Sequence, residues 1–185
     1  MKNNHKLYTI TLCAIFAAII ALISQIAVPT PLGIPLTFQT FAICLCGFML
    51  GTKNALITVL VYIALGMVGM PVFYGFRGGI TAVFGEITGG YIIGFIPLSA
   101  LCGIRKYLYW KKNGKLLSLA AAFSGLMICH ICGAAFYASL TGITFTASMA
   151  LTSLPFLPKD SILLILAFYI TPKLLNAIQK NGIRI

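Results

Sequence analysis

Long blocks of apolar residues, separated by short polar or glycine-rich connections, constrain this chain more than any other feature. Of its 185 residues, 60% are hydrophobic and only 8% are charged, whereas a soluble domain carries about 25% charged residues. So few charges cannot cover a surface that faces water. Several blocks also approach the ~20 apolar residues that a helix needs to cross a bilayer. We therefore predict an all-α membrane protein, with residues 1–185 forming a single transmembrane domain.

We predict a bundle of six transmembrane helices. Their expected bounds are Leu7–Val28, Thr40–Leu50, Ala55–Met70, Gly89–Ile104, Leu116–Leu140 and Pro158–Ile178. The first block is too long for the core of a signal peptide, so we treat it as a helix of the mature protein. The short second helix follows the uncharged stretch Pro29–Pro35, whose prolines exclude helix. We expect this loop to dip into the membrane and cap a cavity at one end of the second helix.

The formal net charge of +11 would suggest a nucleic-acid partner for a soluble protein, but membrane proteins collect Lys and Arg in their cytoplasmic loops. With the N-terminus inside and six alternating segments, every basic residue except Arg77 and Lys159 faces the cytoplasm. These are Lys2, Lys6, Lys53, Arg105, Lys106, Lys111, Lys112, Lys115, Lys173, Lys180 and Arg184. We therefore expect both termini in the cytoplasm, a lipid bilayer as the surroundings and no nucleic-acid partner.

The few charges left on the outer side point to function. They are Arg77, Glu86, Lys159 and Asp160, which include both acidic residues of the chain. Ionisable groups this close to a membrane usually line a cavity and pair with each other or with a ligand. Asp160 and Lys159 belong to the first turn of the sixth helix, where free N–H groups favour an anion. Glycines and aromatic residues alternate between residues 71 and 91, which favours an ordered lid over a flat, partly apolar ligand.

Other functional classes fit the residues less well. The sequence has no GxxxxGK[ST] loop, so ATP hydrolysis in any ATP-driven transport belongs to another polypeptide. An intramembrane enzyme needs a nucleophile and a base close together. The only histidines are His5 and His130, and both carboxylates lie in loops or helix ends on the outer side. Cys129 and Cys132 have CxxC spacing without a second such pair, and we expect buried packing rather than a metal site. We expect no cofactor. A channel or structural protein remains an alternative.

Five stretches resemble the BioY family, the biotin-specific S components of energy-coupling factor (ECF) importers. They are Ile34–Phe41, Gly66–Phe73, Arg77–Ile80, Thr88–Gly94 and Leu154–Asp160, in the family's order over nearly the whole chain. The resemblance implies a six-helix fold with cytoplasmic termini in a bacterial plasma membrane, and biotin uptake rather than catalysis. It also implies a T component and two ABC-type ATPases as partners. An S component for another small vitamin, or a biotin transporter without dedicated partners, stays open.

The resemblance also implies a binding site under the outer loops. Asp160 would accept the N–H groups of the biotin ureido ring, and Gln39 would complete the polar edge. Arg77 or Lys159 would hold the biotin carboxylate, and Gly78, Gly79 and Tyr91 would shape the wall. Three residues depart from the family pattern. Glu86 stands where many relatives run Gly-Pro-Thr-Gly-Gly, Lys159 where many have glycine, and His130 where tyrosine is common. We leave Glu86 outside the site, and we expect His130 to be a packed polar residue.

Small residues on the first helix suggest a contact with a partner. Ala14/Ala18 and Ala17/Ala21 are spaced so that two helices can approach closely in lipid. Packing within the bundle would explain the same pattern. Family members use an alanine face on this helix to dock the transmembrane coupling subunit, so the resemblance implies this role for Ala14 and Ala18.

Overall fold

The computed structural model describes residues 2–31, 33–108 and 112–180. Lys111 and Arg184 lie outside these residues, as do the side chains of Lys2 and Lys6, so their predicted cytoplasmic positions stay predictions. Within the described residues, four helical spans are long and apolar enough to cross a membrane. They are α1 (Lys2–Ser24), α5 (Gly89–Gly103) with its continuation α6 (Arg105–Leu108), α7 (Gly114–Thr141) and α9 (Leu157–Lys180). Helices α2 (Gln39–Leu50) and α3 (Thr52–Met67) are apolar but shorter. The helical membrane class is confirmed, whereas the count of six spans stays a prediction.

Helix α2 forms the centre of the bundle. It packs against α1, α3, α5 and α9, and all of its residues except Phe41 are buried. A helix that is apolar on every side is stable only when other elements surround it. The ring of Phe48 on α2 meets the ring of Phe168 on α9 edge to face, with centroids 5.4 Å apart. By contrast, α1 and α9 expose large apolar side chains such as Leu22 and Ile162, as expected for helices that face lipid.

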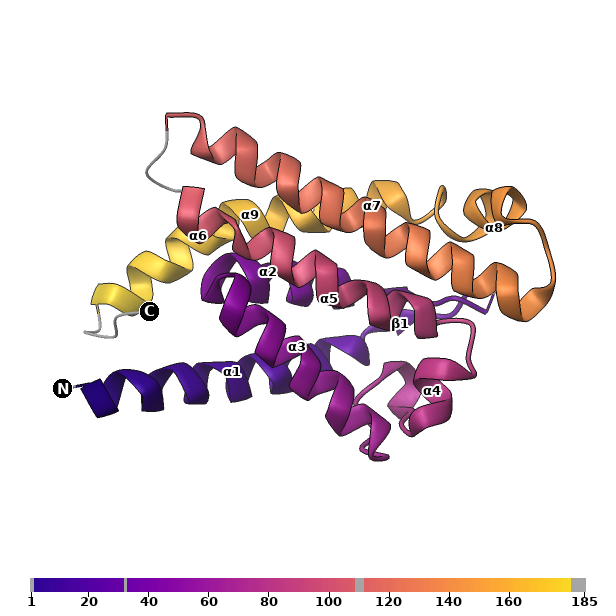
Figure 1. Ribbon diagram of the computed structural model, residues 1–185, viewed down its shortest axis with the longest axis horizontal. Helices are drawn as coiled ribbons and strands as arrows, with labels where there is room; N and C mark the ends of the chain where they lie inside the picture. The colour runs from indigo at the N-terminus through magenta and orange to yellow at the C-terminus, as the bar shows by residue number, and fades with distance from the viewer. Residues whose placement is uncertain (1, 32, 109–111, 181–185) are drawn as a thin grey trace.

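The two ends of the molecule carry different charges. The start of α1, α6 and the end of α9 lie at one end, whereas α4 (Ile80–Phe84), α8 (Phe145–Thr152) and β1 (Ala27–Val28) lie at the other (Figure 1). Gly51, between α2 and α3, lies against Lys106, so Lys53 belongs to the first end as well. The described basic residues thus gather at the end that holds the start of α1 and the end of α9, apart from Arg77 and Lys159. This arrangement follows the charge pattern predicted from the sequence.

The connection after α1 differs from the prediction. The helix ends at Ser24 rather than Val28, and β1 pairs with β2 (Leu36–Thr37) in an antiparallel hairpin. Pro29 biases the residue before it toward extended backbone, which favours strand over helix here. Ser24 Oγ donates to the Val72 carbonyl oxygen at 2.6 Å, so the end of α1 is also held against the loop after α3. Helices α4, α6 and α8 were not predicted because they are only four to eight residues long.

Glycines let α5 and α7 approach closely. A Cβ atom added at Gly94 of α5 would lie 2.8 Å from Cys129 Cα of α7. One added at Gly133 of α7 would overlap the ring of Tyr91 on α5. Helix association in lipid relies on van der Waals contact between small residues. The glycines therefore set the distance between the two helices and the place of Tyr91.

Candidate ligand-binding site

A cavity opens at the end of the molecule that holds α4 and α8. Its walls come from the β1–β2 connection, α2, the loop after α3, α4, α5, α7 and the start of α9. Its empty space, which includes the part open to solvent, totals about 750 Å³. Most of the wall is apolar or aromatic, with Phe73, Tyr74, Phe95 and Phe156 among its residues. Ile34 and Pro35 also line it. They belong to the proline-rich loop that the sequence predicted to cap a cavity.

Asp160 is the buried anion of this cavity. It belongs to the first turn of α9, two residues after Pro158, and is 5% exposed. Its Oδ1 atom lies 2.8 Å from Lys159 Nζ, and its Oδ2 atom lies 3.5 Å from His130 Nε2. The approach of Lys159 lacks hydrogen-bond geometry, so Oδ1 accepts no hydrogen bond from the described residues. Because burying a carboxylate without hydrogen bonds is costly, Asp160 is an acceptor suited to N–H donors of a ligand.

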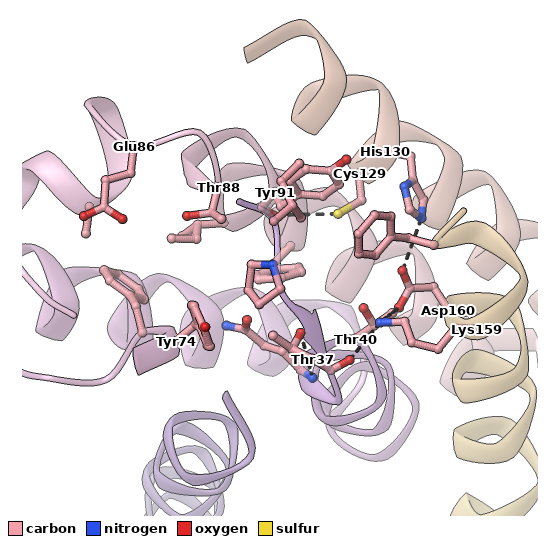
Figure 2. Close-up of a pocket in the computed structure, with 18 of the residues that line it drawn as sticks. Thr37, Thr40, Tyr74, Glu86, Thr88, Tyr91, Cys129, His130, Lys159 and Asp160 are labelled. Carbon is pink, nitrogen blue, oxygen red and sulfur yellow. Dashed lines mark hydrogen bonds and ion pairs between the residues drawn. The ribbon is translucent and has the colours of Figure 1, made fainter. Parts of the chain in front are cut away.

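Lys159, next to Asp160 in Figure 2, and Gln39 also line the cavity. Lys159 Nζ donates to the Thr37 carbonyl oxygen at 2.8 Å, which ties the start of α9 to β2. An ammonium has three donors, so two remain after the hydrogen bond to Thr37. Gln39 Nε2 donates to Tyr62 Oη at 2.7 Å, and its carbonyl oxygen has no hydrogen bond among the described residues. Both residues therefore offer a ligand unused hydrogen-bonding capacity.

Arg77 and Glu86 form the second charged pair. Arg77 Nη1 donates to Glu86 Oε2 at 2.5 Å, and the two side chains are 55% and 30% exposed. Both line the cavity. Figure 2 shows Glu86 at the opposite end of the cavity from Asp160 and Lys159. The outer charges predicted as one group thus form two separate pairs, one exposed and one buried.

Tyr91 and His130 complete the wall between α5 and α7. Tyr91 Oη donates to the Thr152 carbonyl oxygen at 2.6 Å, which links α5 to the end of α8. The rings of Tyr91 and His130 meet edge to face, with centroids 5.8 Å apart. His130 is 2% exposed, lines the cavity and faces Asp160 (Figure 2). It is packed, as expected from the sequence, and it also belongs to the polar wall of the cavity, a position that the sequence left open.

Gly78 and Gly79 are not among the residues that line the cavity. A Cβ atom at Gly78 would clash with the backbone of Gly69 and Met70, and Gly79 has φ +97°, which favours glycine. Gly79 N also donates to the Gly66 carbonyl oxygen at 2.7 Å. These glycines shape the loop before α4, and through it they place Arg77 and Glu86.

Ala14 and Ala18 lie away from the cavity. Both are exposed on the outer face of α1, whereas Ala17 is 5% exposed and packs inward. The alanine pattern thus contains an inner and an outer face, and only Ala14 and Ala18 are available for contact with another protein.

Nearly the whole chain is similar in sequence to known proteins. The sequence model of the BioY family matches residues 1–180. The biotin transporter BioY2 of Lactococcus lactis subsp. cremoris is 30% identical over 182 residues, with 97% of each chain covered. The probable biotin transporter BioY of Pyrococcus horikoshii is 35% identical over 155 residues, covering 84% of this chain and 88% of that protein.

A solved structure has the same fold. The S component for biotin from an ECF-type ABC transporter superposes with a TM-score of 0.83 at 29% sequence identity. The match covers 94% of this chain and 94% of that chain. Sequence and fold agree over almost the full length, and the chain therefore belongs to the BioY family.

Proposed function

We propose that this protein captures biotin as the membrane-embedded S component of an ECF-type importer. Its family, its relatives named as biotin transporters and its structural likeness to a biotin S component all support this function. The observation that carries the assignment to this site is the Asp160 carboxylate, which lines the cavity and whose Oδ1 atom accepts no hydrogen bond from the described residues. The biotin ureido ring supplies N–H donors, and hydrogen bonds to an ionised acceptor are the stronger kind.

The two charged pairs suggest how biotin lies in the cavity. With the ureido ring at Asp160, Gln39 can accept a hydrogen bond near the same end. The biotin carboxylate lies at the far end of its alkyl chain, and Arg77 stands at the opposite end of the cavity beside Glu86. Lys159 is next to Asp160, so it serves the ureido end. The aromatic wall would hold the fused rings and the alkyl chain.

The membrane topology is part of the proposal. We infer six spans with both termini in the cytoplasm and the cavity at the outer face of a bacterial plasma membrane. The basic end of the bundle supports this orientation. At 1.5 Å per residue, α2 is only about 18 Å long, shorter than the ~30 Å hydrocarbon core. Its burial and the loop beside it offset this deficit, because non-helical backbone is tolerated at membrane depth when protein surrounds it.

Partner subunits supply the energy in this proposal. The chain acts as one transmembrane substrate-binding domain, and two ABC-type ATPases and a T component perform ATP hydrolysis and coupling. The exposed face of α1 at Ala14 and Ala18 is where we place the T component, because small side chains permit close helix contact.

Titration of the detergent-purified protein with biotin tests the function, with desthiobiotin and thiamine as comparisons. We expect saturable binding near one biotin per chain in the nanomolar range of tight complexes. Asp160→Ala should weaken it at least about tenfold, because charged hydrogen bonds are lost. Ile162→Leu, at a lipid-facing position of the same helix, should bind as the wild type does. Saturable binding of thiamine alone would assign another vitamin, and a folded protein that binds neither would refute the proposal.

A further inference from the structure

His130 lies in the middle of α7, and side chains of α5 and α9 contact its ring. It is 2% exposed, and Tyr91 of α5 covers one side of the ring edge to face. Ser153, just after α8, donates from Oγ to the His130 carbonyl oxygen at 3.3 Å. Asp160 of α9 faces its Nε2 atom at 3.5 Å (Figure 2). The ring therefore has little freedom to turn away from Asp160.

The two nitrogen atoms of His130 have different surroundings. Nε2 points to the Asp160 carboxylate, whereas Nδ1 is buried and has no hydrogen-bond partner among the described residues. A buried N–H without an acceptor is costly, so the tautomer that carries its proton on Nε2 fits this site. In that form Nε2–H points at Oδ2, and Lys159 stands at Oδ1 on the other side. The separation of 3.5 Å is longer than a standard N–H···O bond, which leaves Oδ2 only partly engaged.

From this geometry we propose that His130 is a positioning residue for biotin recognition. It holds the Asp160 carboxylate from the Oδ2 side while Lys159 holds it from the Oδ1 side, so that the remaining lone pairs face the ureido N–H groups in the cavity. A carboxylate offers about four acceptor positions, enough for His130 and a ligand together. The inference rests on the proposed function, which supplies the ureido group. It gives His130 a role in this site, whereas packing alone does not explain its polar ring atoms.

Two substitutions separate hydrogen bonding from packing. His130→Gln keeps an N–H donor near the place of Nε2, whereas His130→Leu has a similar volume and no donor. We expect His130→Leu to raise the biotin dissociation constant by about tenfold, as loss of one hydrogen bond to a charged group implies. His130→Gln should stay within about threefold of the wild type. Met127→Leu, at a partly exposed position of the same helix, is the matched control and should change nothing. Equal losses in the Gln and Leu variants would overturn the inference.

A double-mutant cycle locates the effect at Asp160. If His130 acts through the carboxylate, His130→Leu should cost little further affinity in an Asp160→Asn background. The same tenfold loss in both backgrounds would show that His130 acts elsewhere and would contradict the proposal.

Nitrogen NMR of histidine-labelled protein tests the contact between His130 and Asp160 directly. This measurement requires neither bound biotin nor a folded His130→Leu variant. The chain has only two histidines, and His5 serves as the internal reference. We expect the His130 Nε2 signal to be that of a protonated nitrogen, to move in Asp160→Asn and to move again on addition of biotin, with His5 unchanged. A His130 signal insensitive to Asp160→Asn would overturn the inference. A wild type that shows the Asp160 response but never binds biotin would instead refute the proposed function.

Discussion

Arg77 reaches the cavity already paired with Glu86, so a biotin carboxylate must compete with a carboxylate of the protein. Exposed ion pairs are worth about 0–1 kcal/mol, and both side chains are substantially exposed. We therefore expect Glu86→Gln to tighten biotin binding modestly, by up to about fivefold. The variant should also make binding more sensitive to salt, because the Arg77–biotin contact is then a single exposed pair. Titrations at low and high ionic strength measure both effects.

Arg77→Gln is the paired control for this prediction. It should weaken biotin binding and remove most of the salt dependence, both alone and combined with Glu86→Gln. If Glu86→Gln weakened binding instead, Glu86 would contact the ligand itself, and the biotin carboxylate would not lie at Arg77.

At the same scale, the sequence predicted some parts of the candidate site better than others. The placement of Asp160 in the first turn of a helix followed from Pro158 and the apolar block after it. The pairing of Arg77 with Glu86 was left open, because it depends on the fold of the glycine-rich segment between them. His130 was expected to be a packed polar residue, with a role in the pocket left open. The available signal was a lone polar ring inside an apolar block, but its direction toward Asp160 is set by the packing of α7 against α9, which no local pattern encodes.

At the scale of elements, the contact between α5 and α7 controls the cavity wall. Gly133 leaves room for the Tyr91 ring, which in turn contacts His130. Alanine is a better helix former than glycine by about 1 kcal/mol, yet overpacking typically costs about 1–3 kcal/mol. We therefore expect Gly133→Ala to lower the unfolding temperature in detergent and to weaken biotin binding several-fold. Thermal unfolding with and without biotin measures both.

Removal of the Tyr91 ring should show whether overlap with this ring causes the loss of stability in Gly133→Ala. In a Tyr91→Leu background, Gly133→Ala should lose most of its effect on the unfolding temperature, because the clashing ring is gone. Ser124→Ala, on an exposed part of α7, should leave stability and binding unchanged. An equal loss of stability from Gly133→Ala in both backgrounds would place the strain elsewhere in the helix pair.

The long helices were predictable because their apolar blocks have helical length and end at glycine, proline or basic residues. Helix α7, predicted as Leu116–Leu140, spans Gly114–Thr141. The hairpin β1–β2 was not predicted, because two strands of two residues each carry no periodic signal. A contact distant in sequence also holds it, because Lys159 of α9 donates to the Thr37 carbonyl oxygen. Such elements are specified by tertiary contacts rather than by their own sequence.

At the scale of the whole molecule, the proposed biotin site and the proposed docking face for partners lie in different places. The cavity lies at the end with α4 and α8, whereas Ala14 and Ala18 face outward along α1 (Figure 1 shows α1). Bulky side chains at these alanines would project into lipid in the isolated protein and would not disturb the core. Ala14→Trp with Ala18→Trp should therefore leave biotin affinity unchanged.

The same double variant should fail to assemble with partners, because two indole rings prevent close approach of another helix. Co-purification with the coupling subunit and both ATPases measures assembly, and biotin uptake in cells measures the consequence. Ile162→Trp, at a lipid-facing position of α9, is the matched control and should assemble normally. Intact assembly of the double variant would exclude this face of α1 as the docking surface. Lost assembly with undiminished uptake would show that the protein transports biotin without dedicated partners, and the outer alanines would then need another explanation.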